Sequence, residues 1–221
     1  MFEHCPINFK DYDDLESVTS SDGSRKYVTP DGIEYPSVTT VLSILSKEFI
    51  DKWKRRVGIE AANKISYAAS YRGTQVHEII EKYLDNDVDY TKGYFPNIIS
   101  SLSSVKSTLD RIGSIYEQEC ALYSNHLKLA GRVDCVAEFD GKLSIIDFKT
   151  SKKLKKKEWI SSYFMQCAAY AIMWEERTNI PIVELVIIIA VDGHEPQVFK
   201  EHRDNWTTDL KDTIYKYNNS F

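Results

Sequence analysis

The chain has 221 residues, of which 43% are hydrophobic, and its formal net charge is −5 at pH 7. This length fits a single domain of ordinary size with a packed core. The acidic balance excludes a globally basic nucleic-acid binder. It does not exclude a local basic stripe, and the lysine run over residues 152–157 is a stripe of this kind.

The expected surroundings of the protein follow from its apolar segments and its cysteines. No segment approaches the roughly 18–20 uninterrupted apolar residues of a membrane span, and the N-terminus has neither a secretory nor a transit signal pattern. Four widely spaced cysteines without a CxxC pattern indicate free thiols in reducing surroundings. We therefore expect a soluble intracellular protein, of a size that suits a phage-infected or bacterial cytoplasm.

The first half of the chain is expected to be mainly helical. Residues 1–25 are polar and acidic and predict a poorly ordered lead-in. Two short strands follow, on either side of a Pro30-Asp31-Gly32 turn. Ser37 is a good N-cap for the first helix. Apolar periodicity then predicts helices over residues 38–45, about 50–67, 71–84 and 96–112.

The second half changes to strand patterns. Residues 115–149 predict a β-meander, because Asp140-Gly141 between two apolar runs is a strong hairpin signal. A helix near 158–177, a buried strand over 186–191, a short strand near 197–201 and a helix over 204–217 follow. The predicted fold class is α/β, with a mixed central sheet flanked by helices. We expect one domain over residues 26–221, divided into an arch-like helical part (26–113) and a catalytic core (114–221).

The hairpin of the meander carries the most informative residues. Asp134 lies on one strand, and Asp147 and Lys149 lie on its partner. Residues two apart in a strand point to the same face, so Asp147 and Lys149 project together. Such a pair is often only an ion pair at a strand end. Two aspartates that converge across a hairpin, however, offer the hard oxygen ligands that Mg²⁺ prefers, and a neighbouring lysine can stabilise charge on a phosphate.

Four motifs in order carry a family resemblance. They are Arg72-Gly73-Thr74 with His77, Gly131-Arg132-Val133-Asp134, Asp147-Phe148-Lys149, and Gln166 with Tyr170. Together they resemble the RecB-like exonuclease branch of the PD-(D/E)XK nucleases, over about residues 35–200. The greatest likeness is to the mitochondrial genome maintenance exonuclease group and its phage and bacterial relatives.

The resemblance implies a metal-dependent DNA exonuclease that uses Mg²⁺, with Mn²⁺ able to substitute, and Lys149 as its catalytic lysine. It implies these metal ligands: His77, Asp134, Asp147 and the backbone carbonyl of Phe148. It also implies these DNA contacts: Ser37, Gln166 and Tyr170. Glu119, on the preceding strand, is expected to support the site at best.

The resemblance leaves the substrate partly open. The late group of three cysteines that holds an iron–sulfur cluster in some relatives has no counterpart after Lys149, so we expect no such cluster. An arch formed by the N-terminal helices would favour single-stranded DNA with free ends. An endonuclease on duplex or branched DNA is an alternative, because the fold does not fix the substrate. A catalytically silent DNA-binding subunit is a weaker one, since the Asp134, Asp147 and Lys149 set is complete.

Overall fold

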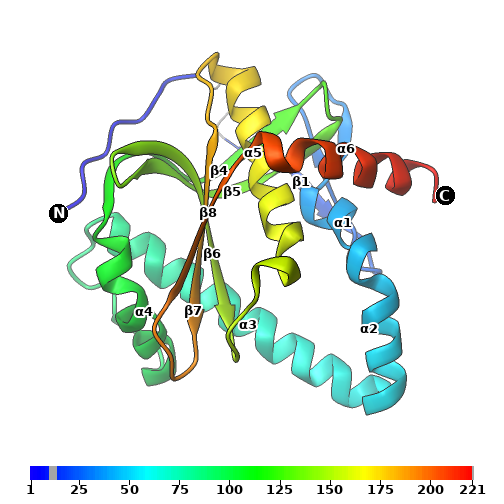
Figure 1. Cartoon of the computed structure of the whole chain (residues 1–221), viewed down its shortest axis with the longest axis horizontal. Coiled ribbons are helices and arrows are strands. Elements are labelled where there is room, and N and C mark those ends of the chain that lie inside the picture. Colours follow the sequence, from blue (N-terminus) through cyan, green and yellow to red (C-terminus); the bar gives the residue numbers. More distant parts are fainter. Residues whose placement is uncertain (10–13, 221) are drawn as a thin grey trace.

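The computed structural model describes residues 1–9 and 14–220. Its centre is a five-stranded sheet in the order β4-β5-β6-β7-β8. These strands are β4 (Ile112–Ser124), β5 (Leu129–Phe139), β6 (Lys142–Ser151), β7 (Glu184–Val191) and β8 (Gln197–His202). β6 and β7 pair in parallel, and the other neighbours pair antiparallel. The predicted mixed sheet flanked by helices is confirmed (Figure 1).

Local sequence explains the two connections around β6. Asp140 and Gly141 join β5 to β6 with φ angles of 52° and 75°, the positive values that a two-residue type I′ turn requires. The parallel pairing of β6 and β7 needs a crossover, and it is made by the 3₁₀ turn η1 (Lys157–Trp159) and the helix α5 (Ser161–Thr178). β6 thus begins after the turn and ends before the crossover, and Lys149 lies near its C-terminal end.

Helices cover both faces of the sheet (Figure 1). One face, which includes Ile146 and Phe148, packs against the second half of α3 (Ile59–Leu84) and against α4 (Pro96–Leu109). The other face packs against α1 (Val38–Leu42), α5 and α6 (Asp204–Asn218). β7 is therefore buried at every position after its first residue. None of the described helices combines the length and the apolar character needed to cross a membrane.

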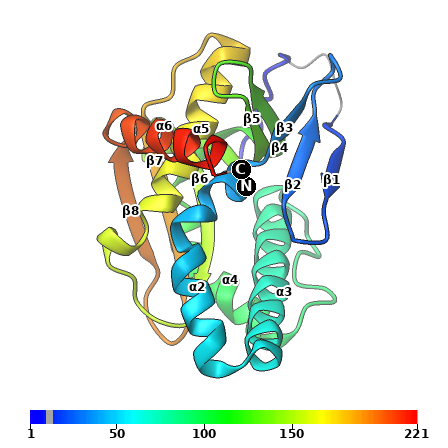
Figure 2. The same cartoon turned by 90° about the vertical axis from the view of Figure 1, so that its right-hand side faces the viewer.

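A helical hairpin projects from this core. It consists of α2 (Ile44–Val57), none of whose residues is buried, and of the first half of α3, where Ala62 alone is buried before Val76. Figures 1 and 2 show the two helices standing away from the sheet, and we call residues 44–75 the arch. The helix break expected between 67 and 71 is wrong. The chain turns at Gly58, whose φ of 87° only glycine adopts readily, and the Ala-Ala-Ser sequence at 68–70 continues the helix.

The N-terminal segment differs from the expected poorly ordered lead-in. Part of its acidic run, residues 11–13, lies outside the described residues. The Phe2 amide donates to Asn86 at 2.7 Å, His4 bridges to Ile115, and Leu15 is buried. A small sheet in the order β1-β2-β3 follows. Its strands are β1 (Ser17–Thr19), β2 (Arg25–Val28) and β3 (Glu34–Pro36). These few anchoring contacts could not be predicted from the polar composition of the segment.

Candidate active site

The site begins where β5 and β6 separate. Their pairing ends at Cys135 opposite Ile146, so the next residues, Asp134 and Asp147, face each other beyond the ladder. The Phe148 amide donates to Asp134 Oδ2 at 2.8 Å. An aspartate side chain thus takes the place of a strand carbonyl. Because the amide and carbonyl of a strand residue point to the same side, the Phe148 carbonyl also faces Asp134.

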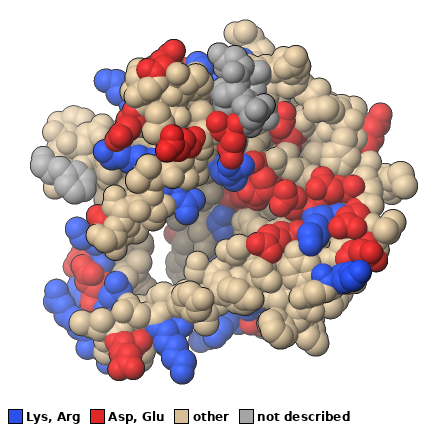
Figure 3. Space-filling model, turned by 180° about the vertical axis from the view of Figure 1, so that it is seen from behind, with Lys and Arg blue, Asp and Glu red and all other residues tan. Residues whose placement is uncertain are grey.

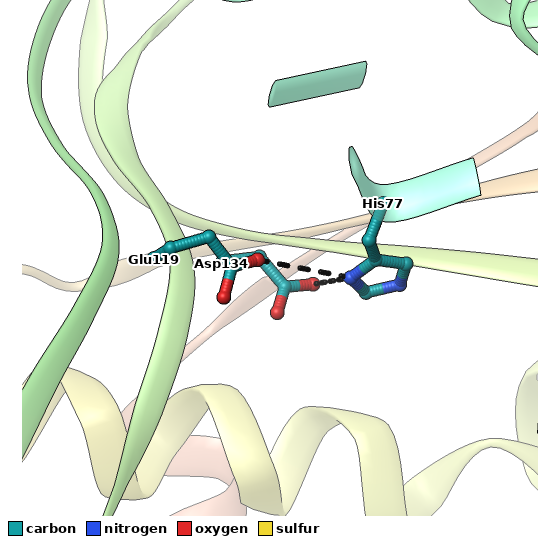
Figure 4. A group of neighbouring side chains, drawn as sticks. All are labelled: His77, Glu119 and Asp134. Carbon is teal, nitrogen blue, oxygen red and sulfur yellow. Dashed lines mark ion pairs between the residues drawn. The ribbon is translucent and has the colours of Figure 1, made fainter. Parts of the chain in front are cut away.

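His77 reaches this point from α3. The buried residues Val76, Ile79 and Ile80 fix that part of the helix on the sheet. His77 Nδ1 lies 3.6 Å from Asp134 Oδ2 and 4.0 Å from Glu119 Oε1 (Figure 4). One ligand atom from each of the three residues lies within 4.8 Å of the others. The structure therefore assembles an imidazole and two carboxylates from three different elements.

Sequence reasoning underrated the part that Glu119 plays in the site. It lies on β4 between the pairs Gln118–Cys135 and Cys120–Val133, and so stands opposite Asp134. Its backbone has a φ of 44°, and its carbonyl accepts a hydrogen bond from the Arg132 guanidinium. The register of the β4–β5 pair brings the Glu119 side chain to the site. That register is hard to predict from the sequence.

Burial and like charge raise the pKa of Glu119 to about 8. Burial is the larger cause, and the neighbouring Asp134 carboxylate is the next. Burial also raises the pKa of Glu81, another acid that lines the same cavity. These carboxylates repel one another when they are ionised. A bound cation would therefore be stabilised by their negative charge.

Asp147 and Lys149 form a separate pair beside this cluster. Both Asp147 carboxylate oxygens lie 2.5 Å from Lys149 Nζ. The geometry fits a hydrogen bond to Oδ1 only, so Oδ2 is buried without a hydrogen-bond donor among the described residues. Its charge is balanced by the Lys149 ammonium at 2.5 Å.

The pair holds its charges in low-dielectric surroundings. Burial raises the pKa of Asp147 above its ordinary value, although Lys149 acts in the opposite direction. Burial disfavours the Lys149 ammonium, but the carboxylates of Asp147 and Asp134 outweigh it and raise its pKa. Lys149 is therefore a cation, and its Nζ lies over the Tyr163 ring, 5.2 Å from the ring centroid. An ammonium in this position can stabilise negative charge on a bound anion.

The remaining candidate residues line one cavity of about 570 Å³ with the cluster and with Lys149. Ser37 is 3% exposed, and its Oγ caps α1 by accepting from the Thr40 amide at 3.0 Å. Gln166 is 9% exposed. Tyr170 is buried over Gly131, where an added Cβ would meet its Oη at 2.8 Å. All three lie at the cavity wall, with little of each side chain open to solvent.

Comparison with known proteins gives the family of the chain. Residues 100–217 match the family model of the PD-(D/E)XK nuclease superfamily. The chain is similar to mitochondrial genome maintenance exonuclease 1 of Xenopus tropicalis, with 32% identity over 175 residues, 73% of this chain and 50% of the relative. The Homo sapiens protein is 30% identical over 174 residues, 72% of this chain and 50% of the relative. The chain thus spans about half the length of these relatives.

Nucleases of this superfamily use divalent metal ions, and the described cluster of His77, Glu119 and Asp134 has a composition that could hold one. The predicted family is confirmed by the match, which covers the hairpin with Asp134 and Lys149. The chain belongs to the PD-(D/E)XK nuclease superfamily.

Proposed function

We propose that the chain is a DNA exonuclease that depends on Mg²⁺ or Mn²⁺ and acts on single-stranded DNA with free ends. The observation that carries the proposal is the convergence of His77, Glu119 and Asp134 beside the Asp147–Lys149 pair. Four elements bring an imidazole, acids and a cation to one point of the sheet, which a purely structural ion pair would not require.

The donor groups fit a divalent cation. Carboxylates from Asp134, Glu119 and Asp147, together with the Phe148 carbonyl, would supply the oxygen ligands that Mg²⁺ and Mn²⁺ prefer. The His77 imidazole would add a nitrogen, which Mn²⁺ accepts. Asp147 is buried beside this group, with both carboxylate oxygens 2.5 Å from Lys149 Nζ.

The residues of the chain would then divide the work of hydrolysis. When bound, the metal supplies neutralisation of the phosphate and a more acidic water. Lys149, held as a cation by Asp147, would donate to a phosphate oxygen as negative charge develops there. The Phe148 amide keeps Asp134 in place. Tyr163, whose ring lies beside Lys149 Nζ, and the buried Tyr170 would limit the access of bulk water, which would strengthen these interactions.

The arch supports a preference for free ends. Figure 3 shows an opening between the arch and the core, with Lys and Arg side chains on its rim. The last turn of α2 carries Lys54, Arg55 and Arg56, which can contact a phosphate backbone. A strand that passes through a closed opening must enter by an end, so a circular strand would be resistant.

The test is digestion of linear and circular single-stranded DNA of the same sequence, with Mg²⁺ and with chelator. We expect loss of the linear form alone, and only with metal. Lys149→Ala should slow cleavage by at least about a hundredfold, whereas Lys211→Ala, an exposed lysine on α6, should not. Cutting of both forms would favour an endonuclease. Metal-independent cutting, or a fully active Lys149→Ala variant, would refute the proposed site.

A further inference from the structure

A second cavity adjoins the catalytic one and has a different character. Its volume is about 730 Å³, and three large aromatic side chains line it: Tyr67, Tyr71 and Phe95. They are 75%, 49% and 63% exposed. Tyr67 and Tyr71 lie four residues apart on α3 and therefore on one side of the helix. Exposed aromatic groups gathered in one groove indicate a binding surface rather than an unfinished core.

The two cavities are lined by successive stretches of the same two elements, α3 and β6. On α3, Gly73 and His77 line the catalytic cavity, and Arg72 and the residues before it line the aromatic one. On β6, Lys149 lines the first, and Thr150 and the residues after it line the second. At about 1.5 Å per residue, Tyr71 lies about 9 Å and Tyr67 about 15 Å from His77 along the helix. Because an α-helix turns about 100° per residue, Tyr71 and His77 lie about 120° apart around α3, so the aromatic cavity lies on a different side of this helix from the catalytic one.

The charge of the aromatic cavity is opposite to that of the catalytic one. Lys64 and Lys152, both exposed, line it together with Arg72. Among the described residues that line it there is no Asp or Glu. Arg72 is paired with Asp192, so the lysines provide the charge open to a ligand. Lysines beside aromatic faces fit a ligand with phosphates and flat rings, such as single-stranded DNA.

We propose that this groove, defined by Lys64, Tyr67, Tyr71, Phe95 and Lys152, holds nucleotides of a single DNA strand beside the arch. Bases stack on Tyr67, Tyr71 and Phe95, and the two lysines contact phosphates. Every base has a π-face that can stack on an aromatic ring, and this face is accessible in an unpaired strand. The groove therefore favours unpaired strands without a sequence preference. This inference rests on the proposed function, because it gives that function its preference for single strands.

Direct binding tests the groove without any cleavage. The dissociation constant of a labelled single strand of about 16 nucleotides is measured by fluorescence anisotropy, in chelator. We expect Tyr67→Ala and Tyr71→Ala each to raise it at least about fivefold, and Tyr67→Phe to leave it near the wild-type value. Tyr215→Ala is the matched control, since Tyr215 is 71% exposed on α6. Circular dichroism confirms that each variant is folded.

An abasic strand separates stacking from charge. We expect the wild-type protein to bind an oligonucleotide of abasic sites at least about fivefold more weakly than the normal strand. In a Tyr67→Ala/Tyr71→Ala double variant this difference should largely disappear, because bases and tyrosines form a double-mutant cycle. An unchanged difference, or tyrosine variants that bind as tightly as Tyr215→Ala, would overturn the proposal. The groove would then serve a protein partner or a second copy of the chain.

Failure of the groove and failure of the proposed function can be told apart. If wild-type protein binds as described but cuts no DNA with Mg²⁺ or Mn²⁺, the groove stands and the exonuclease proposal fails. If wild-type protein cuts and the tyrosine variants bind like wild type, the groove proposal fails and the nuclease remains. A wild-type protein that binds no single-stranded DNA would overturn the groove proposal outright.

Discussion

Gly131→Ala tests the packing that holds the catalytic hairpin against α5. An added Cβ at Gly131 would lie 2.8 Å from Tyr170 Oη and 2.9 Å from Tyr170 Cε1. Tyr170 is 3% exposed in the core between the sheet and α5, so its ring has little room to move. Overpacking of a dense core costs about 1–3 kcal/mol. For a domain of this size we expect the melting temperature to fall by about 2–12 °C.

The assay is urea unfolding of four proteins: wild type, Gly131→Ala, Tyr170→Leu and the double variant. If the clash is with the tyrosine ring, Tyr170→Leu should cost less free energy of unfolding in the Gly131→Ala background than alone, with a coupling of about 0.5–3 kcal/mol. Gly73→Ala is the matched control, since its Cβ meets nothing within 4 Å, and it should be neutral or slightly stabilising. Equal stability of Gly131→Ala and wild type, or strict additivity, would refute the reasoning.

Three further predictions concern charge. Glu119→Gln should weaken Mn²⁺ binding at least about tenfold in isothermal titration calorimetry; equal affinity would remove Glu119 from the ligand set. Because burial raises the pKa of Glu119 to about 8, metal must displace a proton below that pH. Binding should therefore tighten from pH 6 to pH 8 with proton release, measured in buffers of different ionisation enthalpy, and absence of release would contradict this. Arg111 and Lys200 lower the pKa of Asp140 below 3.8, so the ion pairs stabilise the fold above that value and this contribution is lost as pH falls below it. Asp140→Asn should thus destabilise by about 0.2–1 kcal/mol at pH 7 in urea unfolding, with a shrinking difference in acid; a constant difference would exclude this linkage.

Local signals predicted most of the core correctly. The Asp140-Gly141 turn, the Ser37 cap and the apolar run of β7 are each decided by neighbouring residues, and the structure has them as expected. The two-residue spacing of Asp147 and Lys149 also predicts their pairing, since strand periodicity alone places them on one face.

Features that depend on long-range geometry could not be predicted. The part of Glu119 requires the register of β4 against β5, which a shift of one residue would reverse. The break at Gly58 competes with equally plausible breaks, because helical periodicity continues on both sides of it. The anchoring of Phe2 to Asn86 joins residues 84 apart in the sequence and leaves no local pattern.

The central claim is that the acids at the end of the β5–β6 hairpin bind the metal that makes this chain a DNA nuclease. The most direct test is Mg²⁺-dependent cleavage of linear single-stranded DNA by wild type, Asp134→Asn and Asp212→Asn, the last an exposed aspartate on α6. We predict cleavage by wild type and Asp212→Asn, and a loss of at least about a hundredfold in folded Asp134→Asn. Cleavage by Asp134→Asn at the wild-type rate would contradict the account.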